Sequence, residues 1–143
     1  MTIQDWQEYI DLLATYEYNQ LEELEECLFS IPAKYRKVYA LAFAVAAWHP
    51  ANPNRGSDNP LCILYGSHRE CRGCPAKIRG QWCGYVNHPQ KKWVEARINE
   101  KHFMWNEVKQ SKIRHKMKIY ADKFYAHLIA EYEYEYCNLK KEV

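Results

Sequence analysis

Four cysteines lie close together in the middle of the chain and restrict how this part of it can fold. They are Cys62, Cys71, Cys74 and Cys83, separated by eight, two and eight residues. A Cys-x-x-Cys pair lets two thiolates reach one metal ion from a tight turn, and Gly73 inside the pair permits the positive φ that such a turn uses. Each flanking segment is long enough to bring one further ligand. Four thiolates on a tetrahedral Zn²⁺ form a closed structural site, which the spacing therefore predicts here.

The identity of the metal is left open by the spacing. A zinc ribbon carries two Cys-x-x-Cys units, whereas Cys62 has no second cysteine close behind it. The Cys74-Pro75 step is similar to the Cys-Pro that closes ferredoxin cluster sequences, and one Cys-x-x-Cys pair with two distant cysteines can hold a [4Fe–4S] cluster. We therefore expect zinc as the cofactor, with [4Fe–4S] as the alternative and disulfides or free thiols as a third reading. His68 or His88 could replace one cysteine in a mixed site.

Cellular location follows from the cysteines and from the absence of membrane signals. The N-terminus has neither the basic region nor the apolar run of a secretory signal. The longest apolar run, Val38 to Trp48, is far shorter than the roughly 20 residues that span a bilayer. We expect a cytoplasmic protein without membrane contact, in which clustered cysteines act as metal ligands before they act as disulfides. Cys27 and Cys137 lie outside the cluster on helical segments, where buried free thiols are expected.

Hydrophobic periodicity predicts helices before the cysteine segment. Apolar residues recur at three- and four-residue spacing over Ile3 to Phe29, and a further helix is expected over Ala33 to Trp48. The latter is apolar around most of its circumference, so it is expected to be the buried central helix. Pro, Gly and Asn are concentrated between His49 and Pro60, which predicts a loop.

After Pro89 the sequence becomes strongly helical again. The expected apolar faces comprise Trp93, Val94, Ile98, His102, Trp105 and Val108 in the first part and Ile113, Met117, Tyr120, Phe124 and Leu128 in the second. One unbroken helix would exceed forty residues, so Ser111 is expected to be a cap or hinge. The tail from Glu131 to Tyr136 alternates with period two, which fits either a strand or the frayed end of a helix.

These segments together predict a mainly α fold in a single domain, residues 1–143. Residues 1–48 form an N-terminal helical pair, acidic and then alanine-rich. Residues 49–89 form a loop and an irregular, metal-stapled cysteine segment, and residues 90–138 form long basic C-terminal helices. A chain of 143 residues suits one domain with a modest core.

The net charge of +2 conceals a strong segregation of charge. Residues 1–30 carry eight acids and no Lys or Arg, whereas residues 31–130 carry eighteen basic residues and six acids. Such asymmetry is typical of proteins with nucleic-acid or charged protein partners. The other interpretation is that the acidic and basic segments face each other within the fold.

The basic residues concentrate between Lys91 and Lys123, where ten Lys or Arg accompany four acids. Trp93, Phe103, Trp105 and Tyr120 are interleaved with them, so a nucleic-acid interface is possible through phosphate contacts and base stacking. The candidate nucleic-acid-binding residues are Lys91, Lys92, Arg97, Lys101, Lys109, Lys112, Arg114, Lys116 and Lys118.

Residues 61–95 also contain a sequence pattern: Cys62, then Cys71-Arg72-Gly73-Cys74-Pro75, then Cys83, then His88-Pro89 and Trp93. This pattern resembles one in small uncharacterised proteins of tailed bacteriophages, which read Cys-x-x-Cys, then Cys-x-Gly-Cys-Pro, then a further Cys before a Pro-aromatic step and a helix. The second cysteine of the first pair is absent here. The resemblance implies a phage or prophage context and a location in the host cytoplasm, where small accessory proteins often bind host proteins.

No catalytic motif is recognisable in the chain. The six histidines are scattered, and with only five glycines there is no glycine-rich phosphate loop. We therefore expect a non-enzymatic, metal-stabilised accessory protein that docks on a host protein, for example as an inhibitor of a defence or transcription complex. A nucleic-acid-binding module and an iron–sulfur redox or sensor protein are the alternatives. The oligomeric state is left open.

Overall fold

The computed structural model describes residues 33–52, 55–56, 61–66 and 71–141. These ranges contain four helices, α3 (Ala33–Ala47), α4 (Leu61–Tyr65), α5 (Pro89–His102) and α6 (Glu107–Lys141). They contain no strand beyond an isolated bridge between Ile78 and Gln81, so the expected mainly α fold is confirmed. The helices expected before Ala33 lie outside the described residues. None of the four helices is long and apolar enough to cross a membrane.

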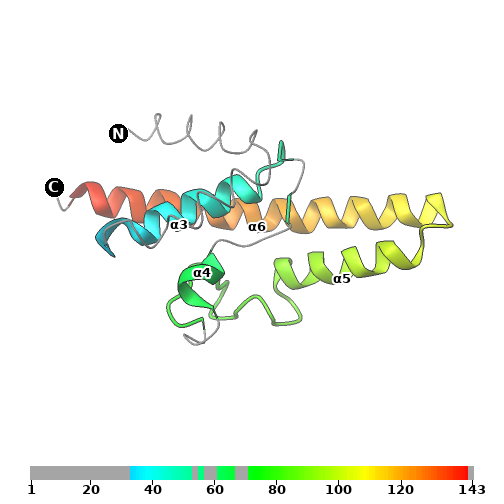
Figure 1. Ribbon diagram of the computed structural model, residues 1–143, viewed down its shortest axis with the longest axis horizontal. Helices are drawn as coiled ribbons and strands as arrows, with labels where there is room; N and C mark the ends of the chain where they lie inside the picture. Colours follow the sequence, from blue (N-terminus) through cyan, green and yellow to red (C-terminus); the bar gives the residue numbers. More distant parts are fainter. Residues whose placement is uncertain (1–32, 53–54, 57–60, 67–70, 142–143) are drawn as a thin grey trace.

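Helix α6 is the axis on which the other long helices pack. Figure 1 shows α3 running along the C-terminal half of α6, while α5 lies antiparallel beside its N-terminal half. The short helix α4 and the cysteine segment that follows it lie near the start of α5. Helices α5 and α6 thus form a hairpin, and its closed end points away from α3 and α4.

The buried helix predicted from sequence is α3. Every residue from Ala40 to Trp48 is buried, as is Val38. Five of these residues are alanine, whose small side chains permit close approach of neighbouring helices. At the edge of this contact, Lys37 Nζ lies 2.8 Å from Glu135 Oε1 on α6.

The residues that α6 contributes to the core lie on one side of this helix. The buried residues recur at spacings of three and four, which places them on one side of the helix: Ala121, Phe124, Leu128, Tyr132 and Tyr136. Tyr134, between the last two, is exposed. The alternating tail is therefore helical, and the strand that its period-two pattern allowed is wrong.

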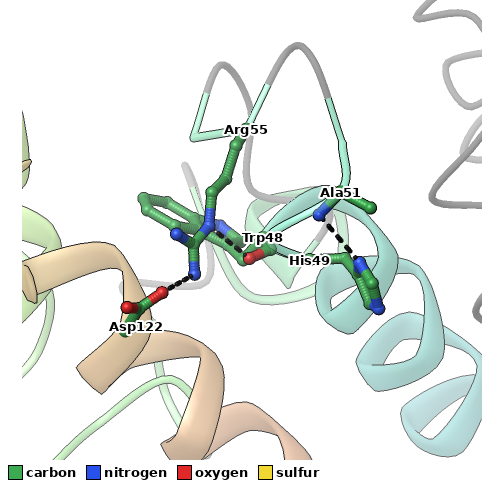
Figure 2. Close-up of polar contacts among 5 residues, drawn as sticks. All are labelled: Trp48, His49, Ala51, Arg55 and Asp122. Carbon is green, nitrogen blue, oxygen red and sulfur yellow. Dashed lines mark hydrogen bonds and ion pairs between the residues drawn. The ribbon is translucent and has the colours of Figure 1, made fainter. Parts of the chain in front are cut away.

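Trp48 joins the three long helices just after α3 ends. Its ring makes edge-to-face contacts with Phe124 of α6, at 4.8 Å between ring centroids, and with Trp93 of α5, at 5.4 Å. Arg55 closes the following loop over it: Nε donates to the Trp48 carbonyl at 2.7 Å, and Nη2 lies 2.6 Å from Asp122 Oδ1 (Figure 2). The loop that sequence predicted after His49 is thus fastened to both α3 and α6.

The break between α5 and α6 lies at residues 103–106, so the hinge predicted at Ser111 is wrong. The Phe103 N–H donates to the Glu100 carbonyl at 3.1 Å and closes α5. Asn106 then caps α6, because its side-chain Oδ1 accepts from the Lys109 N–H at 3.1 Å. Ser111 lies inside α6 instead.

Candidate functional site

The cysteine segment is folded around a Cys-x-x-Cys turn. The chain returns from α4 so that the Cys71 N–H donates to the Tyr65 carbonyl at 2.6 Å, and the Cys74 N–H donates to the Cys71 carbonyl at 3.2 Å. Cys71 (φ 58°) and Gly73 (φ 70°) both lie in the left-handed region. This confirms the positive φ expected at Gly73, and a β-carbon there would meet nothing within 4 Å.

Three of the four predicted metal ligands are electrostatic neighbours. Cys74 is buried, and Cys71 and Cys83 are half-buried. Burial raises the pKa of the Cys74 thiol to about 11, and negative charge on Cys83 and Cys71 would raise it further. Burial also raises the pKa of Cys83, again with a contribution from Cys71. Each thiol therefore opposes ionisation of the next, a situation that a cation between them would reverse.

The fourth predicted ligand, Cys62, is exposed on α4. Within the described ranges, no three Cys, His, Asp or Glu side chains take up an arrangement that could hold a metal ion. Sulfur donors suit zinc or an iron–sulfur cluster, so the donor chemistry fits these metals while the four-ligand geometry is not formed. The metal site remains a prediction. None of the five described cysteines is in a disulfide.

The two cysteines expected outside the cluster give different results. Cys137 is exposed on α6, so the expectation of a buried thiol there is wrong. It follows the inward-facing Tyr136 by one residue, and a step of about 100° turns it away from the core. Cys27 lies outside the described residues.

His88 caps α5 and is not placed as a metal ligand. It is only 1% exposed. Its Nδ1 accepts from the Gln90 N–H at 3.1 Å, and its Nε2 donates to the Ala76 carbonyl at 2.8 Å. Because both ring nitrogens are engaged, the mixed site considered for His88 is not formed. The other candidate, His68, lies outside the described residues.

A second histidine ties the same backbone to α6. His127 Nε2 donates to the Pro75 carbonyl at 2.8 Å. The carbonyls of Pro75 and Ala76, directly after Cys74, are thus held by side chains from α6 and from the start of α5. Sequence analysis missed this role of His88 and His127. The signal for His88 was present, because a polar residue before Pro89 matches an N-cap followed by proline at the first helical position.

We expect acid to destabilise the fold through His88. Burial lowers the pKa of His88 below its usual value of 6.5, and the neighbouring His127 lowers it further. As the pH falls below about 6.5, the imidazole is protonated in the unfolded chain but not in the folded one, so protons favour unfolding. The free energy of unfolding from urea titrations should therefore fall between pH 7.5 and 5.5.

Two variants isolate the contribution of His88. In His88→Asn the side chain can still cap α5 but has no imidazole to titrate, so the pH-dependent loss should shrink. His115→Asn, at an exposed position of α6, should keep the wild-type profile. An unchanged slope in His88→Asn would contradict the assignment.

The nine candidate nucleic-acid-binding residues all lie on the α5–α6 hairpin. Lys91 and Lys92 are half-buried, and the other seven are exposed: Arg97, Lys101, Lys109, Lys112, Arg114, Lys116 and Lys118. Three of these seven have partners on the hairpin. Arg114 Nε donates to Glu100 Oε1 at 2.7 Å, Arg97 lies 5.4 Å above the Trp93 ring, and Lys109 lies 4.8 Å above the Phe103 ring.

Four lysines of α6 form a stripe along one side of the helix. Lys109, Lys112, Lys116 and Lys123 recur at spacings of three, four and seven residues, and all four are exposed. We call them the lysine stripe. Lys123 was not among the nine candidates, although it closes the basic segment. In the described part of the chain, no acidic side chain pairs with any of the four.

The aromatic residues interleaved with these cations divide into two groups. Trp93 is buried, and Phe103 and Tyr120 are half-buried, so the single apolar face expected from Trp93 to Val108 is wrong. The helix break before Glu107 changes the phase of the pattern. Met104, Trp105 and Val108 are instead 71%, 76% and 67% exposed, and we call these three residues the hairpin tip.

Comparisons with known protein families, with curated proteins and with solved structures find no match to this chain. The resemblance of residues 61–95 to phage proteins therefore stays an expectation. What the described residues offer for function is the cysteine segment, the lysine stripe and the hairpin tip.

Proposed function

We propose that this protein is a non-enzymatic nucleic-acid-binding protein whose binding surface is the α5–α6 hairpin. The lysine stripe carries the proposal. Lys112 and Lys116 are one helical turn apart, and like charges at this spacing repel and destabilise a helix. An anionic polymer lying along the stripe would relieve this repulsion and release its own counterions, which is the main source of affinity for nucleic acids.

The length of the stripe suits a run of phosphates. Lys109 and Lys123 are fourteen residues apart, or about 21 Å along a helix at 1.5 Å per residue. One strand of DNA places about six phosphates over that distance. Helix α6 also fixes the backbone spacing of the lysines before binding, so less backbone ordering remains to be done than on a flexible basic loop.

Reversing two charges of the stripe tests the proposal. The variant K112E/K116E should weaken binding of a labelled 20-nucleotide oligomer at least about tenfold in fluorescence anisotropy. The slope of log affinity against log salt concentration should become shallower, by the amount that corresponds to the loss of about two phosphate contacts. R79E/K141E is the control, because it changes the net charge equally at exposed positions away from the stripe. Equal losses in both variants, or no wild-type binding at low salt, would reject the proposal.

Docking on a host protein is the second candidate, favoured by the exposed apolar residues of the cysteine segment. Trp82 and Tyr85 are exposed in edge-to-face contact, with ring centroids 5.8 Å apart, and Val86 beside them is also exposed. Aromatic residues are enriched in protein interfaces. In this reading the protein would be a phage accessory factor that inhibits a defence or transcription complex in the host cytoplasm.

Capture from host lysate separates the two candidates. W82A/V86A should lose a captured protein that K112E/K116E retains if the cysteine segment is the docking surface. Capture by the wild type that is lost in K112E/K116E but kept in W82A/V86A, and that nuclease treatment of the lysate abolishes, would reject docking through the cysteine segment.

We also propose that a metal, zinc or alternatively [4Fe–4S], stabilises the segment that carries Trp82 and Tyr85. The mutual electrostatic influence of Cys71, Cys74 and Cys83 supports this. The histidine hydrogen bonds fasten Pro75 and Ala76 to the helices. Residues 82–87, in contrast, belong to no helix or strand. A metal would therefore add most order where the aromatic side chains are displayed.

A further inference from the structure

The turn that carries the hairpin tip is fixed by hydrogen bonds on both sides. The Phe103 N–H donates to the Glu100 carbonyl at 3.1 Å, and the Asn106 N–H donates to the Phe103 carbonyl at 3.0 Å. Asn106 in turn caps α6 through the Lys109 N–H. Met104 and Trp105 are therefore held at the closed end of the hairpin by a capped turn, and the turn needs no rearrangement to present them.

Trp105 is nevertheless left uncovered. Its ring contacts the half-buried Phe103 at 6.2 Å between centroids, but most of its surface is accessible. Met104 and Val108 are exposed as well, so three exposed apolar residues lie within a stretch of five at the closed end of the hairpin. Isolated exposed apolar side chains are ordinary, whereas a group of three that includes a tryptophan indicates a contact surface.

The charges around the hairpin tip restrict the chemistry of the partner that can bind there. Lys101 lies in the last turn of α5, Lys109 lies over the Phe103 ring, and Lys112 lies one turn further along α6. A partner must therefore offer negative charge and an apolar surface at a short distance from each other. Nucleic acids offer both, because each nucleotide carries a phosphate and a flat base.

We propose that Trp105 stacks on unpaired bases, so that the hairpin takes single-stranded nucleic acid in preference to a duplex. This inference rests on the proposed function, since the lysine stripe supplies the phosphate contacts. The bases of a duplex are covered by their neighbours and reach a tip of this kind only after unstacking, which costs a few kcal/mol per step. Unpaired bases expose their faces without that cost.

The test compares a labelled single-stranded 20-mer with the duplex of the same sequence at low salt. Wild-type protein should bind the single strand more tightly. Trp105→Ala should weaken single-strand binding by about 5- to 150-fold, the range that corresponds to about 1–3 kcal/mol for one stacked base. Its duplex affinity should stay unchanged. Trp82→Ala removes a tryptophan on the cysteine segment and should leave both affinities at the wild-type level.

The outcomes distinguish failure of this inference from failure of the proposed function. Equal binding of single strand and duplex, unaffected by Trp105→Ala but lost in K112E/K116E, would overturn stacking and leave phosphate binding intact. No binding of either oligomer would overturn both. Binding to vesicles of anionic phospholipid in place of oligomers, lost in Trp105→Ala, would also overturn both and assign the tip to a lipid surface.

Discussion

Replacing Trp48 by alanine is expected to lower the free energy of unfolding by about 3–5 kcal/mol. Trp48 is fully buried, and its ring contacts both Trp93 and Phe124. Its removal would leave a cavity where α3, α5 and α6 meet. Because these helices begin far apart in the sequence, the cavity cannot close by a local shift of one segment. The loss of unfolding free energy should therefore lie near the upper end of the range for removing a large buried side chain.

Trp105→Ala is the matched control for Trp48→Ala. It deletes the same side chain from a position where three quarters of the residue is exposed, and it should change the free energy of unfolding by no more than about 0.5 kcal/mol. Urea titrations followed by far-ultraviolet circular dichroism measure both variants on one scale. Similar destabilisation by the two substitutions would contradict the placement of Trp48 at the junction. It would also remove Trp105 as a residue free to bind.

The long elements of the fold were predictable because their apolar residues are numerous and periodic. An uninterrupted apolar run from Val38 to Trp48 has no stable place except inside a protein, and α3 is buried accordingly. The spacing of Phe124 and Leu128 likewise identified the inward side of α6. Hydrophobic burial dominates the energetics of such segments, so the pattern alone was sufficient.

The turn between α5 and α6 was not predictable in the same way. Ser111 and Asn106 are both good helix caps, and the sequence offers no apolar signal that separates them. The difference lies in tertiary packing. Glu100 pairs with Arg114 across the hairpin, and Phe103 lies under Lys109. Both contacts require the chain to reverse before Glu107. A break at Ser111 would place Arg114 too near the turn to face Glu100.

The sequence identified the segments that hold the candidate sites, but not which of their residues lie together or are exposed. Charge composition identified residues 91–123 as basic, yet only the helix phase shows that four of the lysines share one side of α6. Four interleaved aromatics were equivalent in sequence, and burial then singled out Trp105. For the cysteines, local spacing gave the turn at Gly73 correctly. It could not give the position of Cys62, which depends on where α4 packs.

Removing one thiol of the cysteine segment should produce the largest single effect in this protein if the metal prediction is right. Wild-type protein purified without oxygen is expected to carry about one zinc per chain, and Cys74→Ser is expected to carry almost none. Structural zinc contributes an apparent binding free energy of about 10–16 kcal/mol in small zinc peptides, and that energy is available only to the folded state. Chelator should therefore lower the melting temperature of the wild type but leave that of Cys74→Ser unchanged.

Cys137→Ser is the control, because Cys137 is a free thiol exposed on α6, outside the segment. It should keep both the metal and the chelator response. A wild type without metal, or equal metal content in Cys74→Ser and Cys137→Ser, would contradict the prediction. Iron with sulfide and visible absorbance would instead favour the [4Fe–4S] reading and a sensor role.

Cys62→Ser decides how the fourth ligand is supplied. Cys71, Cys74 and Cys83 influence one another electrostatically, and Cys62 is exposed on α4. Loss of metal in Cys62→Ser would mean that Cys62 supplies the fourth thiolate from α4, next to the buried Leu61. The metal would then couple α4 to the Cys-x-x-Cys turn. Retention of metal in Cys62→Ser would mean that three thiols and another donor are sufficient.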